Sequence, residues 1–508
     1  MEDTSSVSKI AERGEVHVEK LDSAGSLSTP LSTTDHYEPT SDEEKALDID
    51  KTNIGYVATS TFISDAHLSK NAVGDSLSLF SATYVPLQPL SVLAARRFGP
   101  KYWIAGLLIT WGMLCMCHAA IQNQSTLIAL RLLLGAAESG FTPSSFYLMS
   151  TIYPKYILGL RMGIFSGMYA VAGACAGLIA YGLLQVSSTH IKGWQVLFLL
   201  EGGITVIVGI AVLILIPARL ETCWFLTYRE RKHAIHRMRI DQASTHDMNS
   251  ENGFNPRDIT DVLKDWKKIL IVIFNILGVL PVNAFTTFLP LIVEGMGYDG
   301  IDATLMSVSP FVAGAVVLVF IVWSSDRSRD RSGHIVGGMV LALIGCIVMA
   351  TSNNPHLRYG FSHVCMAGIF VSGPLTAAWL AGNTPLMGPR SFILGLNGYT
   401  NVGGVIAGQL YLAKYSPDCE LFMFKTLTQR YLHTDFMMFF SLDKLPLIIT
   451  VILIAVGIAG LLGIRFAYMR TNRWRLQKLA STDEATLEAE ANADGRRGDQ
   501  RYTFTYGY

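Results

Sequence analysis

Two ionisable residues, Arg131 and Glu138, lie within the apolar run 126–149 of this 508-residue chain. Their spacing is about two helical turns, so a helix would present both side chains on one face. An ionisable group at the centre of a membrane helix costs about 2.5–3.5 kcal/mol on insertion scales. An arginine fork can bind a carboxylate through two hydrogen bonds, and a desolvated carboxyl group can take up a proton. Two interpretations stay open: a site for an anion and a proton, or buried braces between helices.

The composition is that of a membrane protein. Half of the residues are apolar, 16% are charged and 45 are glycine, as is typical of helices that pack closely in lipid. The formal net charge is zero, which argues against a nucleic-acid partner. The scattered cysteines form no CxxC pair, and the chain has no nucleophile elbow, P-loop or HExxH motif. We therefore expect no enzyme activity, metal site or cofactor.

Eleven apolar runs are long enough to cross a bilayer as helices of about 20 residues each. They cover residues 76–95, 102–121, 126–149, 160–185, 194–217, 268–293, 304–324, 334–351, 360–382, 393–413 and 446–468. These runs predict an all-α, polytopic membrane protein. We expect five parts: a disordered cytosolic tail (1–49), a first transmembrane half (50–217), a cytosolic central loop (218–267), a second transmembrane half (268–468) and a cytosolic C-terminal tail (469–508).

Basic residues indicate the orientation. Arginine and lysine follow the first, third, fifth and seventh runs, whereas most alternate loops carry few. Basic loops face the cytosol in membrane proteins, which places the C-terminus there. With eleven spans the N-terminus would lie outside. A twelfth span before residue 76 would place both termini in the cytosol and divide the chain into six plus six.

Five segments carry a family resemblance. They are DKTNI at 50–54, RLLLGAAESG at 131–140, WQVLFLLEGG at 194–203, WSSDRSRDR at 323–331 and GDQRYTF at 498–504. The chain resembles the major facilitator superfamily and, within it, the fungal allantoate/nicotinate/pantothenate permeases of the anion:cation symporter branch. The resemblance implies two halves of six helices. The family has an apolar span before its first motif, but here 43–49 runs directly into that motif, so the first helix is expected to be truncated.

The resemblance implies roles for the ionisable residues. Arg131 would help to hold an anionic substrate, and Glu138 would take up and release the coupling proton. Asp50, Lys51 and Asn53 resemble the charged group of the family's first helix, with Lys51 in place of the usual arginine. Lysine keeps the charge of that position but loses the bidentate fork.

The resemblance also implies a gate at 323–331. Asp326 would meet a neighbouring helix N-terminus, while Arg327 and Arg331 would pair across the half and hold one access state closed. The first-half copy of the motif, at 93–100, carries Arg96 at the usual aspartate position. We therefore do not expect that copy to latch in the same manner.

Several further residues are candidates to line a central cavity. Asn401 begins the segment NVGG at 401–404, which resembles a family motif of the eleventh helix. The other candidates are Tyr84, Gln88, Asn283, Phe285, His363 and Trp379. Packing alone would also explain a polar residue such as His363.

Together these observations predict a secondary transporter that takes up a small organic anion with protons by alternating access. Allantoate, nicotinate and pantothenate are examples of that substrate class. We expect a monomer in the plasma membrane, with the lipid bilayer and the substrate as its partners. An exporter of a fungal metabolite and a truncated, transport-incompetent or receptor-like paralogue stay open as alternatives.

Overall fold

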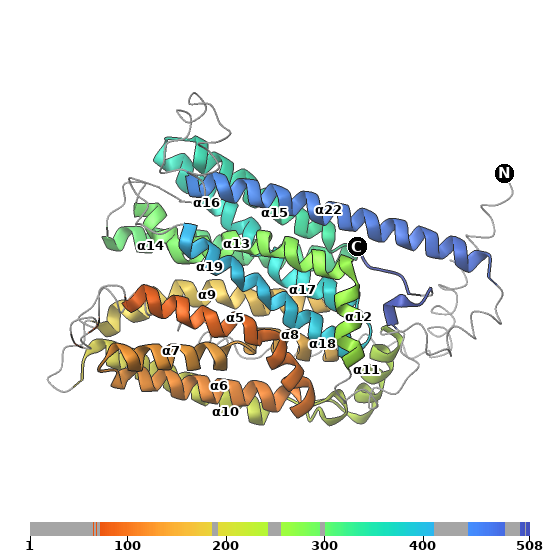
Figure 1. Cartoon of the computed structure of the whole chain (residues 1–508), viewed down its shortest axis with the longest axis horizontal. Coiled ribbons are helices and arrows are strands. Elements are labelled where there is room, and N and C mark those ends of the chain that lie inside the picture. The colour runs from red at the N-terminus through yellow and green to blue at the C-terminus, as the bar shows by residue number, and fades with distance from the viewer. Residues whose placement is uncertain are drawn as a thin grey trace.

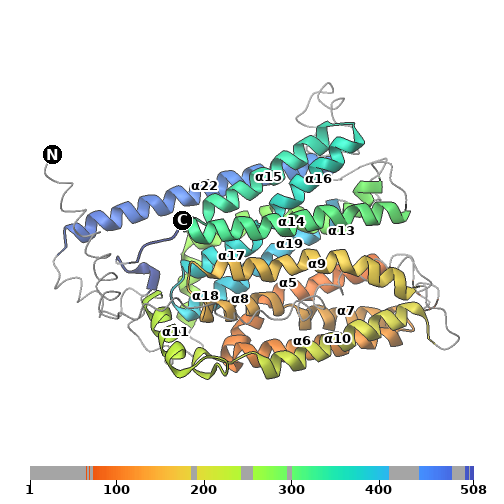
Figure 2. The same ribbon diagram turned by 180° about the vertical axis from the view of Figure 1, so that it is seen from behind.

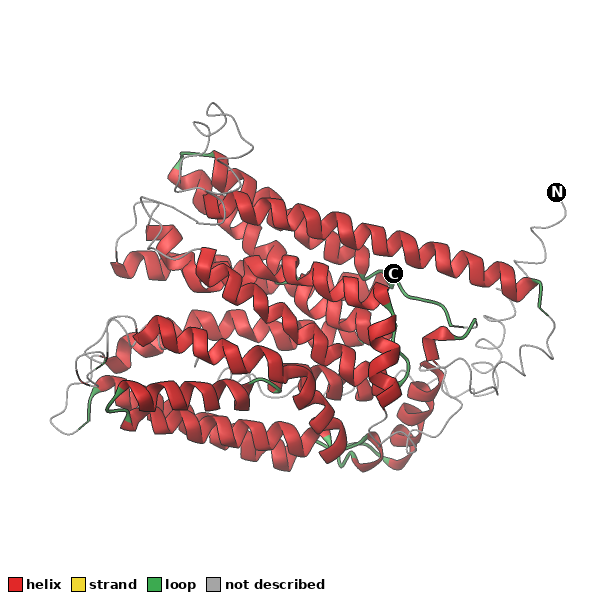
Figure 3. Cartoon of the chain, in the orientation of Figure 1, coloured by secondary structure: helices red, strands yellow, loops and turns green. Residues whose placement is uncertain are grey.

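The computed structural model describes residues 65, 68, 72–184, 191–241, 256–294, 300–410, 445–482, 498–502 and 504–508. Helices form the regular elements of these residues (Figure 3). The expected first helix, and with it Asp50, Lys51 and Asn53, lies outside the described residues.

The first half follows the predicted apolar runs closely. Its helices are α5 (Ala72–Phe98), α6 (Pro100–Cys117), α7 (Gln124–Glu138), α8 (Phe141–Ile152), α9 (Leu158–Leu184) and α10 (Gly193–Leu215). The run at 126–149 is not one helix but two, because the helix breaks at Ser139 and Gly140. A side chain at Gly140 would collide with Ser91, since its Cβ would lie 1.6 Å from the Ser91 Oγ. Close packing against α5 therefore coincides with the break.

The second half repeats this plan. Its helices are α13 (Trp266–Glu294), α14 (Gly300–Ser328), α15 (Ser332–Thr351), α16 (Pro355–Ile369), α17 (Ser372–Gly382), α18 (Met387–Asn397), α19 (Val402–Leu410) and α22 (Leu445–Ala480). The 3-10 turn η3 (Gly398–Asn401) separates α18 from α19. With 36 residues, α22 is about 54 Å long, so it extends well beyond a hydrocarbon core of about 30 Å.

Seven of the described segments are long and apolar enough to cross a membrane. They are Pro100–Ala120, Gly193–Leu215, Trp266–Phe285, Val308–Ser328, Ser332–Thr351, Pro355–Gly382 and Leu447–Ala480. Large apolar side chains such as Ile207, Ile214 and Phe320 are about two-thirds exposed on the outward faces of these helices. Such faces are stable in lipid rather than in water.

The helices form two bundles that lie side by side (Figures 1 and 2). A large apolar core fills the second half, and a smaller one joins α5, α6, α7 and α10 in the first. A third cluster, which we call the junction cluster, crosses between the halves. It packs Val92, Phe146, Tyr147, Leu158 and Met162 against Ala377, Ala378, Ala381 and Leu394.

One end of the double bundle carries most of the polar additions. The short helices α11 (Tyr228–Asp241) and α12 (Pro256–Lys264) lie there, beside the C-terminus (Figure 1). We call this end the tail face, and we call residues 498–502 and 504–508 the tail segment. The junction cluster includes the ends of α8 and α17 and the start of α9, which meet near this face.

Candidate functional site

Arg131 and Glu138 are both buried on α7, with 2% and 4% of their surfaces exposed. Helix α7 lies tightly against α5: the Thr83 hydroxyl donates to the Leu132 carbonyl over 2.9 Å, and a Cβ at Gly135 would lie 2.4 Å from the Phe80 carbonyl oxygen. The two ionisable groups are separated by about 10 Å of helical rise. They are therefore held by a rigid helix within the first half.

Glu138 is the last residue of α7, directly before the break that leads into α8. Helix α7 has 15 residues and ends at Glu138, and α8 has 12 residues and begins after the break. Glu138 therefore lies near the middle of the span that the two helices form. The hydroxyl of Ser139 turns back to the Ala136 carbonyl over 2.8 Å. A carboxyl group at the middle of a span, beside an interruption of the helix, is well placed for proton exchange.

His118 is a buried neighbour of this site that the sequence motifs did not single out. Its Nδ1 lies 2.8 Å from the Leu114 carbonyl oxygen, and its ring packs on Phe198 with a centroid distance of 5.3 Å. With 1% of its surface exposed, His118 is a packed polar residue of the first half.

Gln88 on α5 faces the second half. Its side chain is fully buried, and a Cβ at Gly398 would lie 1.5 Å from its Oε1. Among the described residues neither its Oε1 nor its Nε2 has a hydrogen-bond partner. An unsatisfied buried amide costs about 1–3 kcal/mol. This cost, at a contact between the halves, marks Gln88 as a functional candidate.

The second half contributes a chain of amide and hydroxyl groups next to Gln88. The Asn275 Nδ2 donates to the Asn397 Oδ1 over 3.1 Å, and the Thr376 hydroxyl donates to the Asn275 Oδ1 over 3.1 Å. All three residues are buried, and they come from α13, α18 and α17. Sequence analysis missed them because isolated asparagines in apolar runs gave no spacing signal.

Asn401 lies at the end of η3 and is half-buried. Its Nδ2 donates to the Gly398 carbonyl over 3.0 Å, so part of its amide stabilises its own turn. The neighbouring residues Tyr399 and Val402 pack against the core of the first half. Asn401 thus holds the interruption between α18 and α19 at the contact between the halves.

The other predicted cavity residues have diverse surroundings. Tyr84, Phe285 and Trp379 are buried, and Asn283 donates to the Val279 carbonyl over 3.3 Å. His363 Nε2 lies 2.8 Å from the Ser309 hydroxyl, and its Nδ1 lies 3.0 Å from the Tyr359 carbonyl oxygen.

The predicted gate joins the two halves at the tail face. Asp326 pairs with Arg331 over 2.6 Å, and the same carboxylate accepts the Leu160 backbone N–H over 2.6 Å. Arg331 also donates to the Lys155 carbonyl over 2.5 Å. Asp326 and Arg331 belong to the second half, whereas Lys155 and Leu160 precede or begin α9 in the first. The carboxylate therefore meets the N-terminus of a neighbouring helix.

The bonds described above do not include Arg327, whose side chain is exposed in the last turn of α14. Arg329, in the turn that follows α14, has a left-handed φ of 56°. This conformation is uncommon for a non-glycine residue.

The first-half copy of the motif has a different partner. Arg96 pairs with Asp258 of α12 over 2.8 Å, and both side chains are at least 90% buried. Asp258 also lies against Gly388 at the start of α18, where a Cβ would be 2.0 Å from its Oδ2. The central loop thus supplies the carboxylate that this copy lacks and holds it against the second half.

Comparisons with known proteins agree with this architecture. The family model of the Major Facilitator Superfamily matches residues 47–408. The MFS-type transporter efuF of Hormonema carpetanum is 30% identical over 373 residues, which are 73% of this chain and 75% of that protein. The high-affinity nicotinic acid transporter of Saccharomyces cerevisiae is 28% identical over 378 residues, 73% of this chain and 68% of that protein.

Solved structures show the same fold. The E. coli fucose:proton symporter FucP matches with a TM-score of 0.59 at 11% identity, covering 84% of this chain and 97% of that one. The proton:xylose symporter XylE matches with a TM-score of 0.56 at 13% identity, covering 83% and 93%. With a family model that covers most of the chain and a matching fold, this protein belongs to the major facilitator superfamily.

Proposed function

We propose that this protein is a proton-coupled importer of a small organic anion that works by alternating access. The observation that carries the proposal is the burial of Arg131 and Glu138 on one helix of the first half. An arginine can bind a carboxylate, and a nearby carboxyl group can exchange a proton with each cycle. Neither group is stable in a membrane without such a role or a structural partner.

Two further observations support the substrate class and the coupling. A relative that is 28% identical is named a nicotinic acid transporter, and two proteins with the same fold are titled proton symporters. Nicotinate is a small carboxylate, which fits an arginine in the site. We place the protein in the anion:cation symporter branch on this basis.

Charge supports the orientation and the access state. The tail face carries Arg96, Arg331, Lys155 and the basic end of α22, so the positive-inside rule places it in the cytosol. The C-terminus is then cytosolic, as both termini would be in the intact six-plus-six topology of the family. The plasma membrane is the expected location of a monomer. Asp326, Arg331 and the junction cluster join the halves near that face. These contacts support the proposal that this is a state closed toward the cytosol.

The test is uptake of labelled nicotinate, pantothenate and allantoate by yeast cells that lack their own uptake systems. Uptake should rise at acidic external pH and collapse with an uncoupler. The Glu138→Gln variant should lose the dependence on pH, and Arg131→Lys should bind the anion more weakly because the fork is lost. Uptake that is indifferent to both pH and uncoupler would exclude proton symport, and outward flux alone would favour an exporter.

A further inference from the structure

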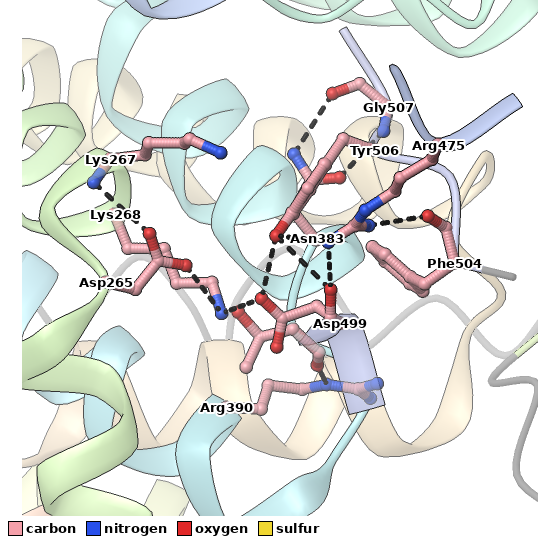
Figure 4. Close-up of polar contacts among 11 residues, drawn as sticks. Asp265, Lys267, Lys268, Asn383, Arg390, Arg475, Asp499, Phe504, Tyr506 and Gly507 are labelled. Atoms are coloured by element: carbon pink, nitrogen blue, oxygen red, sulfur yellow. Dashed lines mark hydrogen bonds and ion pairs between the residues drawn. The ribbon is translucent and has the colours of Figure 1, made fainter. Parts of the chain in front are cut away.

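The end of the chain folds back onto the tail face (Figure 4). The Gly507 carbonyl accepts hydrogen bonds from the Trp379 indole over 2.8 Å and from the Asn383 Nδ2 over 3.0 Å. The Gly507 N–H donates to the Asn383 Oδ1 over 2.8 Å. The tail segment is thereby bound at the end of α17, next to the loop that leads into α18.

A second pair of reciprocal hydrogen bonds fastens the tail segment to α22. The Tyr506 N–H donates to the Asn472 Oδ1 over 3.0 Å, and the Asn472 Nδ2 donates back to the Tyr506 carbonyl over 2.9 Å. The Tyr506 ring stacks on Tyr468 with a centroid distance of 4.4 Å. Tyr506 is 5% exposed, so its ring is part of the core of the second half.

Buried charges add to this binding. Lys268 of α13 pairs with Asp499 over 2.7 Å and with Asp265 over 3.3 Å, although only 3% of the lysine side chain is exposed. Arg475 donates to the Asp499 carbonyl over 2.8 Å and to the Phe504 carbonyl over 2.7 Å. A buried cation needs such partners. The tail segment therefore neutralises and hydrogen-bonds cations that α13 and α22 bury.

The tail segment also reaches the gate and the first half. The Arg331 N–H donates to the backbone oxygen of Tyr508 over 2.5 Å, while the Arg331 guanidinium holds Asp326 and the Lys155 carbonyl. The Lys155 ammonium lies 5.8 Å from the centre of the Phe504 ring. A Cβ at Gly507 would lie 2.9 Å from the Lys155 Nζ. One residue of the gate, Arg331, is thus bound at once by the tail segment and by the loop of the other half.

We propose that the tail segment is an intramolecular latch that stabilises the state closed at the tail face. Opening that face must separate Lys155 from Arg331 and from Gly507, since these contacts join opposite halves. The docked tail segment holds Arg331 of the second half in place at this contact. Release of the tail segment therefore lowers the barrier to opening. The inference rests on the alternating access of the proposed function, but not on the substrate or on proton coupling.

The experiment measures opening without any substrate. Ser150, at the end of α8, is 1% exposed, and its carbonyl accepts a hydrogen bond from Arg390 of the second half over 3.0 Å. A Ser150→Cys substitution places a thiol in this closed contact, and purified full-length protein in lipid nanodiscs exposes both faces to a maleimide. The native cysteines also react, so the rate measured for the protein that keeps Ser150 is subtracted. The remaining labelling rate reports opening of the tail face.

The main variant is Asn383→Ala in the Ser150→Cys background. It removes two hydrogen bonds to Gly507 and changes no charge. We expect labelling to be faster by on the order of tenfold, because each lost bond favours release of the segment. Removal of residues 504–508 should increase the labelling rate further. If the shortened chain does not fold, the labelling rate of Asn383→Ala alone tests the latch.

The matched control is Asn354→Ala. It removes the hydrogen bonds that Asn354 Oδ1 accepts from the N–H groups of His356 over 3.0 Å and Leu357 over 3.5 Å, at the start of α16. This site lies at the end of α15 that is opposite the gate. Labelling of this variant should equal that of the parent. Unchanged labelling in Asn383→Ala would overturn the latch, as would equal acceleration by Asn354→Ala. Absence of uptake of every tested anion would refute the proposed function and leave this measurement intact.

Discussion

Arg331 joins three parts of the protein: its guanidinium binds the Asp326 carboxylate over 2.6 Å and the Lys155 carbonyl over 2.5 Å, while its backbone N–H binds the last residue of the chain. Asp326 completes the contact by accepting the N–H of Leu160, at the start of α9. Because these bonds connect opposite halves, the cluster has to come apart whenever the tail face opens.

The gate predicts a large effect for Asp326→Asn. This change leaves the buried Arg331 without its counter-ion, and loss of one partner of a buried pair costs about 3–5 kcal/mol. The melting temperature should fall, and a cysteine at Ser150 should react faster. The exposed Arg327 provides the control, since Arg327→Ala should change neither quantity. Equal effects of the two variants would mean that the gate is not the Asp326–Arg331 pair.

The unsatisfied amide of Gln88 predicts a gain in stability. Gln88→Met keeps the unbranched shape and removes two buried polar atoms, so the protein should be more stable by about 1–2 kcal/mol. Transport should weaken, because we expect Gln88, a candidate to line the central cavity, to meet the substrate when the halves separate. Thermal unfolding and uptake measure the two effects.

Asn275→Leu is the matched comparison. It removes a buried amide whose hydrogen bonds to Asn397 and Thr376 are made, so it should lower the melting temperature. A loss of stability in both variants would show that Gln88 has hydrogen-bond partners in the folded protein.

The close approach of α5 and α7 predicts that Gly135→Ala is harmful. The added methyl would lie 2.4 Å from the Phe80 carbonyl oxygen and 2.5 Å from the Thr83 hydroxyl, so the backbones must move apart. Overpacking of this kind costs about 1–3 kcal/mol, and it would shift Arg131 and Glu138. Gly106→Ala, where no atom lies within 4 Å, should leave the melting temperature nearly unchanged. Similar melting temperatures for the two variants would contradict the tight packing.

Docking of the tail segment should weaken at alkaline pH. Burial, together with the negative charge of Asp499, raises the pKa of Tyr506 above the value of about 10 for free tyrosine. The released segment then loses its tyrosine proton at a lower pH than the docked one. The stabilisation is complete below pH 10 and is lost as the pH rises from there through the raised pKa.

A fluorophore on the tail segment would follow this release, and Tyr506→Phe should remove the alkaline step. The charged and titratable groups that face Tyr506 are Asp499, Asp265, Lys267, Lys268, Arg475 and Tyr468. An alkaline step that persists in Tyr506→Phe would have to be assigned to one of them, most directly to Lys267, and not to Tyr506.

The helices could be predicted from the sequence because a bilayer requires apolar runs of a known length. Each of the eleven runs corresponds to a helix or to two consecutive helices in the structure. The interruptions at Ser139 and at Gly398 could not be predicted in this way. They depend on contacts with Ser91 and Gln88 of another helix, and hydropathy contains no information on such contacts.

The candidate site was predicted in part. Arg131 and Glu138 stood out because ionisable residues are rare in apolar runs, and both are buried. Asn275, Thr376 and Asn397 come from three helices, and their hydrogen bonds depend on the rotation of each helix about its axis. The choice of Arg331 over Arg327 likewise depends on where α14 ends and how the following turn reverses.

The sequence by itself determined a helical membrane protein with two halves and ionisable groups in the first, because burial in lipid restricts composition and length. It also indicated the tail segment, through the resemblance of residues 498–504. Only the tertiary structure decided that this segment returns to the gate. Its bonds to Trp379, Asn383 and Arg331 use the backbone groups of Gly507 and Tyr508, and since every residue has such groups, no side-chain pattern could reveal them.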